Sequence, residues 1–284
     1  MPLYSHTVNT LNRRSPLHRR LSLLFLAISF CAAALAAFTW FDNEANRGVA
    51  YRAPRAPIAW ADVPQVGVNA FNLQYEPDPA NVTRTLELAR DLGAAFVRIQ
   101  MPWDDVEIHA KGDFEDRRNP EHIRSSWEKY DFIVAEAARL DLELIVRLDR
   151  APRWARPNDD AEARFQAGLQ ENPDSTGPPE NYGDYADFVA AVAGRYRGKV
   201  RFLQLWNEPN LAYEWSWRIP EPERFVELLR GAAEAARAAN PDVVVVFPSL
   251  SPTDGKEPRK APMSELEYLD RVYRAGGAPY FDIM

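Results

Sequence analysis

Residues 203–210 read Leu-Gln-Leu-Trp-Asn-Glu-Pro-Asn, an apolar run that passes directly into polar residues. Pro209 lacks a backbone N–H and cannot continue a central strand. A strand over residues 200–206 therefore ends with Asn207 and Glu208 at its carboxyl end. In barrels of parallel strands that end carries the catalytic residues, so Asn207 and Glu208 are the first candidates for chemistry.

The same kind of apolar run recurs along the chain. The runs are continuous rather than alternating, as expected for parallel strands that are covered on both faces. Amphipathic stretches at helical spacing separate them, so the pattern is strand and helix repeated five times, followed by the start of another strand. We expect strands at residues 66–68, 95–99, 142–146, 200–206, 243–247 and 280–284.

Two architectures fit this series, a doubly wound sheet and a (β/α)8 barrel. No Gly-x-Gly-x-x-Gly or Walker-type loop follows any of the runs, so the usual nucleotide-binding sequence of the open sheet is missing. The segments after the runs are long and rich in Trp, Pro and Asp, and residues 149–181 show no clear periodicity. Barrels build their active sites from such loops. We predict an α/β fold, a (β/α)8 TIM barrel of which strands 1–6 are present.

The amino-terminal segment has a different character. Residues 21–41 contain no charged residue, four arginines precede them, and two acidic residues follow. Such a run at about 1.5 Å per residue spans about 30 Å, the thickness of a bilayer core, and the arginines keep the start in the cytoplasm. An uncleaved anchor fits, and so does a signal peptide with a cleavage site at residues 34–36. Either way, the remainder is membrane-anchored outside the cytoplasm or secreted.

Charge divides the chain in the same way. The 284 residues carry a net charge of −7, but residues 1–55 hold seven arginines and two acidic residues, a net charge of +5, which leaves −12 for the rest. An acidic body argues against nucleic acid as a partner. A single cysteine excludes a disulfide framework. We expect a basic cytoplasmic segment at 1–20, the anchor or signal at 21–41, a linker at 42–62 and the barrel at 63–284.

Several motifs occur in the order known from one group of enzymes. From about residue 64 to residue 284 the chain resembles glycoside hydrolase clan A, the retaining (β/α)8 glycosidases that include cellulase-type and β-xylosidase-type families. In that clan an Asn-Glu pair ends strand four and an Arg lies on strand two. The matching motifs are Asn207-Glu208, Val97-Arg98-Ile99, Met101-Pro102-Trp103, Ala151-Pro152-Arg153-Trp154-Ala155 and Tyr280-Phe281-Asp282-Ile283.

The resemblance implies roles for individual residues. Glu208 takes the place of the general acid/base, Asn207 hydrogen-bonds to the sugar 2-hydroxyl, and Arg98 holds the nucleophile carboxylate. The implied reaction is hydrolysis of β-linked glycosides or polysaccharides by double displacement. No cofactor or metal is expected, and the partners are a carbohydrate substrate and, through residues 21–41, a membrane. Aromatic faces suit the apolar faces of sugars, and the expected substrate-binding residues are Trp103, Asp149, Trp154 and Trp206.

The chain also departs from the clan's pattern. The clan's nucleophile is a Glu at the tip of strand seven, so we expect a C-terminally truncated fragment whose nucleophile lies beyond Met284. Asp149 stands where cellulase-type members more often have His, which is less typical of the cellulase branch. Two other functions stay open. One is a non-catalytic carbohydrate-binding or scaffold protein on a degenerate barrel, and the other is a barrel lyase or isomerase that uses Glu208 as a base.

Overall fold

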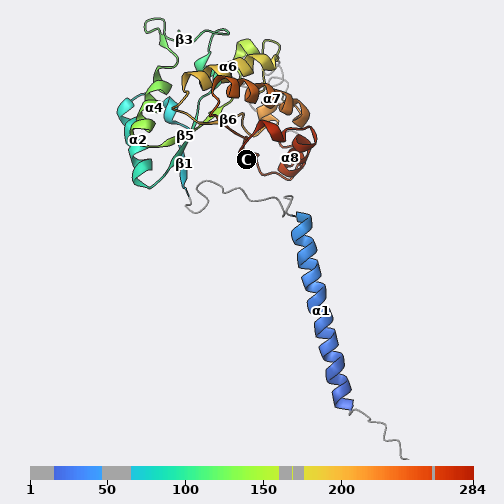
Figure 1. Cartoon of the computed structure of the whole chain (residues 1–284). Helices are drawn as coiled ribbons and strands as arrows, with labels where there is room; N and C mark the ends of the chain where they lie inside the picture. Colours follow the sequence, from blue (N-terminus) through green and yellow to red (C-terminus); the bar gives the residue numbers. More distant parts are fainter. Residues whose placement is uncertain (1–15, 47–64, 160–167, 169–175, 258–259) are drawn as a thin grey trace, which may run out of the picture. The chain divides into compact units, whose positions relative to one another are not determined.

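The chain divides into two units, residues 1–62 and residues 63–284, and each is described by itself. The first unit contains one helix, α1 (Pro16–Asn46), within its described residues (Figure 1). The apolar part, Arg20–Phe41, has 22 residues, and at about 1.5 Å per residue it extends about 33 Å, enough to cross a bilayer core. By length and composition α1 is therefore a candidate membrane span or signal sequence.

The computed structural model describes residues 16–46, 65–159, 168, 176–257 and 260–284. Most of the linker predicted over residues 42–62 lies outside these ranges. Much of the long loop predicted after the third strand, residues 149–181, also lies outside them.

Five parallel strands form the main sheet of the second unit, in the order β1-β2-β5-β6-β7. Neighbours in this order are paired in parallel. The first five predicted strands are confirmed, with ends that differ by one or two residues. At the predicted sixth strand, the described residues form only a parallel bridge between Ile283 and Val246. The bounds of the five strands are β1 (Gly67–Asn69), β2 (Phe96–Gln100), β5 (Glu143–Leu148), β6 (Phe202–Leu205) and β7 (Val244–Val246).

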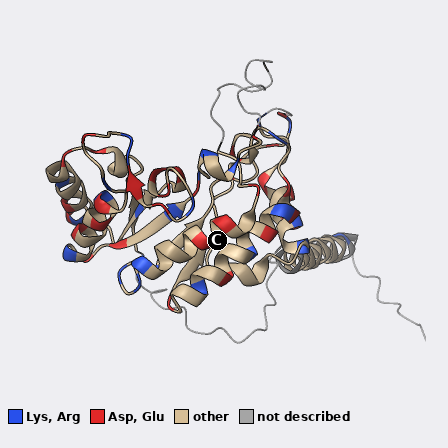
Figure 2. Ribbon diagram, turned by 90° about the horizontal axis from the view of Figure 1, so that it is seen from above, with Lys and Arg blue, Asp and Glu red and all other residues tan. Residues whose placement is uncertain are grey.

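A helix follows each of these strands, which gives the alternating order of a (β/α) barrel. Three of the helices start at side chains that accept a backbone N–H of the first turn, Asp78, Asn181 and Ser264. Each helix turns an apolar stripe toward the sheet, and Figure 2 shows acidic and basic residues interspersed over the helices. The helices are α2 (Pro79–Asp91), α4 (Glu128–Arg139), α6 (Tyr182–Arg195), α7 (Pro222–Ala239) and α8 (Glu265–Arg274).

Shorter elements lie in the loops. The sequence pattern did not predict the hairpin between β2 and α4, because its two strands have only two residues each and show no periodicity. The hairpin strands are β3 (Glu115–Asp116) and β4 (Arg124–Ser125). The single helical turns are η1 (Leu73–Tyr75), α3 (Trp103–Val106), η2 (Arg153–Ala155), η3 (Tyr213–Trp215) and η4 (Ala278–Tyr280).

The carboxyl ends of β5 and β6 are joined through one carbonyl group. The Leu148 carbonyl oxygen accepts the Trp206 backbone N–H at 2.9 Å and the Tyr185 hydroxyl at 2.7 Å. Tyr185 lies on α6 and is fully buried, so this bond fixes the helix to the ends of the two strands. The loops that continue from β5 and β6 therefore begin at strand ends that hydrogen bonds hold together.

Replacing Tyr185 with Phe removes this hydroxyl and leaves the ring in place. We expect the free energy of unfolding to fall by about 1 kcal/mol, the usual net value of one buried hydrogen bond. Tyr273→Phe on α8 is the matched control, because Tyr273 is 47% exposed and its change should stay within about 0.5 kcal/mol. Urea unfolding of both variants measures the difference, and equal losses would contradict the assignment.

Candidate active site

The chain leaves β6 in an unusual backbone conformation. Trp206 and Glu208 have φ angles of +79° and +31°, in the left-handed region that residues other than glycine seldom adopt. Such conformations persist where surrounding contacts hold them, and they cluster at functional sites. The surrounding core holds Trp206 in this conformation, because its ring is fully enclosed and packs edge-on against Tyr185. The resulting turn places Asn207 and Glu208 just beyond the end of β6.

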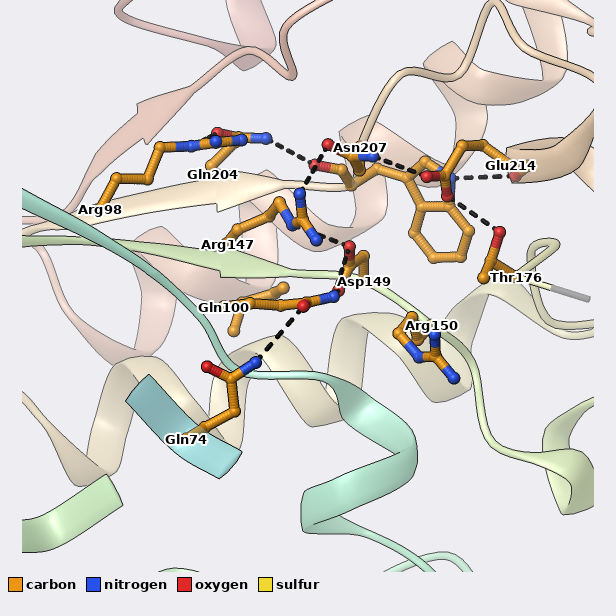
Figure 3. Close-up of polar contacts among 12 residues, drawn as sticks. Gln74, Arg98, Gln100, Arg147, Asp149, Arg150, Thr176, Gln204, Asn207 and Glu214 are labelled. Carbon is orange, nitrogen blue, oxygen red and sulfur yellow. Dashed lines mark hydrogen bonds and ion pairs between the residues drawn. The ribbon is translucent and has the colours of Figure 1, made fainter. Parts of the chain in front are cut away.

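Asn207 is fixed at both ends of its carboxamide. Its Oδ1 accepts a hydrogen bond from the Arg147 guanidinium at 3.0 Å, and its Nδ2 donates to Glu214 Oε1 at 2.6 Å (Figure 3). The residue is only 7% exposed. Because a cationic donor faces the oxygen and an acceptor faces the nitrogen, only one orientation of the amide satisfies both contacts.

A buried ion pair lies behind Asn207 at the end of β5. Arg147 Nε lies 2.9 Å from Asp149 Oδ2, and Gln100 Nε2 donates to the same carboxylate at 2.9 Å. Asp149 is 1% exposed. Burial raises the pKa of Asp149, and the charge of Arg147 opposes that shift. Figure 3 shows how this network continues through Gln100 to Gln74 on η1.

Arg98 lies on the neighbouring strand β2 and is partly buried. Its Nε donates to Gln204 Oε1 at 2.7 Å, and its guanidinium lies 4.6 Å from the centre of the Phe71 ring. The Arg147 guanidinium lies 4.8 Å from the same ring, so the two cations share one aromatic contact. Burial, followed by the nearby Arg147 charge, lowers the pKa of Arg98 to about 10, which keeps it charged at neutral pH.

Glu208 carries the accessible carboxylate among these polar side chains. Its side chain is half-buried, and within the described parts of the chain its carboxylate makes no hydrogen bond. Its backbone carbonyl accepts the Leu211 N–H at 2.9 Å, which stabilises the turn after β6. The carboxylate lies close enough to Arg98 for their charges to attract each other. Glu208 therefore combines a fixed backbone with a carboxylate that a ligand can reach.

Three of the four residues predicted to bind substrate are buried. Trp103 is fully buried and stacks on Phe188, with ring centres 5.4 Å apart and planes 13° apart. Trp206 and Asp149 are enclosed as described above, so neither tryptophan offers a face to a sugar. The apolar core takes up these rings because burying a large aromatic surface is favourable. Trp154 is only partly buried, and its Nε1 donates to the Glu107 carbonyl at 2.7 Å.

Sequence reasoning missed Arg147 and also the buried carboxyl group of Glu214. Glu214 lies on η3, is 6% exposed, and its carboxyl contacts Asn207 and the Thr176 hydroxyl. Burial, followed by the charge of Asp149, raises the pKa of Glu214 to about 8. The only signal in the sequence was its position between Tyr213 and Trp215, which favours burial but does not reveal the partners.

Two of the carboxyl groups at this site, Glu208 and Glu214, lie in contrasting environments. Glu208 is reachable and lies near the positive charge of Arg98, whereas Glu214 is enclosed and its pKa is raised. Different environments are how proteins assign different tasks to similar acids. In the part of the chain that the structure describes, no three His, Cys, Asp or Glu side chains gather as a metal site would require.

The comparisons with known proteins identify the family. The Cellulase family model, glycosyl hydrolase family 5, matches residues 57–264. The chain belongs to the cellulase family. It does so although Asp149 stands where cellulase-type members more often have His. No curated protein sequence matches the chain.

Solved structures share the fold of this cellulase-family chain. A family 39 glycoside hydrolase from the gut symbiont Bacteroides cellulosilyticus WH2 has a TM-score of 0.52 and 20% identity, over 76% of this chain and 36% of that chain. The GH39 enzyme from Xanthomonas axonopodis pv. citri has a TM-score of 0.51 and 13% identity, over 77% and 39%. The chain thus spans less than half the length of either structure, and the likeness supports the barrel fold.

Arg147 is the residue whose loss should destabilise the site most. In Arg147→Met the buried Asp149 loses its ion-pair partner, and we expect the free energy of unfolding to fall by about 3–5 kcal/mol. Arg195→Met is the control, because the Arg195–Asp131 pair lies at the surface and its loss should cost less than about 1 kcal/mol. Urea unfolding at neutral pH compares them, and a small effect at Arg147 would contradict the ion pair's importance.

Proposed function

We propose that this chain carries the general acid/base of a retaining glycosidase that cleaves β-linked glycosides, with Glu208 in that role. The observation that carries the proposal is the reachable carboxyl of Glu208 beside the fixed amide of Asn207, at a strand end of a cellulase-family barrel. Hydrolysis of glycosidic bonds is the chemistry that the family suggests. The substrate is therefore a carbohydrate, and the double-displacement route follows from the resemblance to clan A.

The proposed reaction has two steps. A nucleophilic carboxylate attacks the anomeric carbon while Glu208 gives its proton to the leaving oxygen. Glu208 then takes a proton from water, and that water hydrolyses the glycosyl-enzyme. Retaining enzymes hold the two carboxyl groups about 5–5.5 Å apart. We assign the nucleophile to neither Asp149 nor Glu214, because both are buried and already hydrogen-bonded within the network.

Asn207 and Arg98 support Glu208 in this proposal. The amide nitrogen of Asn207 has two N–H groups, and only one is used by Glu214, which leaves the second for a sugar hydroxyl. Arg98 lies near Glu208, and we assign it to holding the nucleophile carboxylate, as the resemblance to clan A implies. Trp154, the one partly buried tryptophan of the predicted set, is the proposed aromatic contact to the sugar.

Replacing Glu208 with Gln keeps the shape of the side chain and removes its proton. For aryl β-glycosides with poor leaving groups we expect kcat/KM to fall by about 10²- to 10⁴-fold, because the departing oxygen is no longer protonated. The loss should be smaller for activated leaving groups, which need little protonation. Steady-state kinetics of the complete protein measures both.

Glu143→Gln provides the matched control for this substitution. Glu143 is exposed at the opposite, amino-terminal end of the neighbouring strand β5, so its change should leave kcat/KM unaltered. Unchanged turnover of poor leaving groups by the Glu208 variant would reject the acid/base assignment.

We also propose that residues 21–41 of α1 anchor the chain in a membrane and that residues 63–284 lie outside the cytoplasm. Support comes from the apolar run, which is long enough to span a bilayer, and from the arginines before it. Residues 1–20 are then the cytoplasmic segment and residues 42–62 the linker. A large, uniformly apolar helix surface exposed to water would otherwise be unfavourable.

Membrane fractionation tests the anchor. The full chain should stay in the membrane pellet after washing with alkaline carbonate, and mass spectrometry should find residues 1–20 still attached. A variant without residues 1–62 should be recovered in the supernatant. Release of a shortened chain that starts after residue 36 would identify a signal peptide instead.

A further inference from the structure

Glu214 is a buried acid that the double-displacement mechanism does not use. It lies on η3, in the loop that follows β6, and its Oε1 accepts the Asn207 N–H at 2.6 Å. The Thr176 hydroxyl lies 3.0 Å from its other oxygen, Oε2. Both carboxyl oxygens thus contact polar groups, as Figure 3 shows, and one of those groups is the amide proposed to recognise the sugar.

A count of protons shows which form of Glu214 fits these contacts. The Thr176 hydroxyl carries one proton and lies 3.0 Å from both the Tyr213 carbonyl oxygen and Glu214 Oε2. The carbonyl can only accept, and so could an ionised Glu214, so the single hydroxyl proton can be given fully to only one of them. The second contact is then a hydrogen bond only if Glu214 itself carries a proton and donates it to Thr176 Oγ1. With Glu214 protonated, the Asn207 amide, the Thr176 hydroxyl and the Tyr213 carbonyl each have a hydrogen-bond partner.

The charges around Glu214 favour the same form. Asp149, on the end of β5, raises the pKa of Glu214, while Arg147 on the same strand lowers it less than burial raises it. Asp159, on the loop before α6, is paired with Arg156, so the charges of these two residues oppose each other. Burial together with Asp149 therefore leads to the pKa of about 8.

We propose that protonated Glu214 is a positioning residue, which holds the Asn207 amide in the orientation needed to bind a sugar hydroxyl. This inference rests on the proposed glycosidase function. The neutral carboxyl links Asn207 to Thr176 and so joins the loop before α6 to the end of β6. When Glu214 ionises, the bond to Thr176 loses its proton and the new negative charge faces Asp149. Repulsion between the two carboxylates then displaces Glu214, and with it the Asn207 amide that donates to it.

The kinetic test compares wild type with Glu214→Gln and Glu214→Ala in the complete protein. Gln can accept from Asn207 and donate to Thr176 at every pH, so it reproduces the protonated acid. We expect its kcat/KM on an aryl β-glycoside at pH 6.5 to stay within about threefold of wild type, and Glu214→Ala to lose about tenfold or more.

The pH profile separates positioning from a merely structural role. The ratio of kcat/KM for Glu214→Gln to that of wild type should be flat below about pH 7 and rise above about pH 8. Only the wild-type protein has a side chain at position 214 that ionises in this range, so only its kcat/KM falls for this reason. Using the ratio cancels every other ionisation that the two proteins share. A ratio that is constant with pH, or a Gln variant as impaired as the Ala variant, would overturn the proposal.

Infrared spectroscopy gives a readout that needs no activity. Wild type at pH 6.5 should show a protonated carboxyl C=O band that disappears above about pH 8 and is missing in Glu214→Gln. The band should persist in Glu208→Gln. If that variant keeps full activity while the band persists, the acid/base proposal fails and the protonation of Glu214 stands. If wild type at pH 6.5 lacks the band, the inference about Glu214 fails by itself.

Discussion

The guanidinium of Arg147 connects the buried polar groups at the strand ends. It pairs with Asp149 just beyond the end of its own strand, donates to the Asn207 amide beyond β6 and lies over Phe71. A buried carboxylate is stable only with such a partner. The position of Asn207, and through it that of Glu214, therefore depends on one cation. The turn after β6 can hold its unusual backbone because these contacts surround it.

Much of the fold follows from simple patterns in the sequence. Continuous apolar runs predicted the five strands, since parallel strands are buried on both faces, and Pro209 set the end of β6. The hairpin between β2 and α4 could not be foreseen, because two-residue strands carry no periodicity. Strand ends also moved by a residue or two, since local pairing decides where a strand stops.

The site was predictable only in part. Its placement beyond β6 follows from Asn207 and Glu208 in the sequence. Trp103 and Trp206 were predicted to bind substrate, and the structure buries both rings in the core. A tryptophan near a strand end can face the core as well as a ligand, and sequence alone does not tell which. Glu214 was missed for a similar reason. Its raised pKa depends on burial and on the charge of Asp149, which lies far away in the sequence.

The central claim is that Glu208 serves a retaining reaction in a cellulase-family barrel. The most direct measurement is proton NMR of the first product formed by the complete protein from an aryl β-glycoside, recorded before the sugar's anomers equilibrate. Double displacement inverts the anomeric carbon twice, so the account predicts that the β-anomer appears first. Initial formation of the α-anomer would show a single displacement and contradict the account.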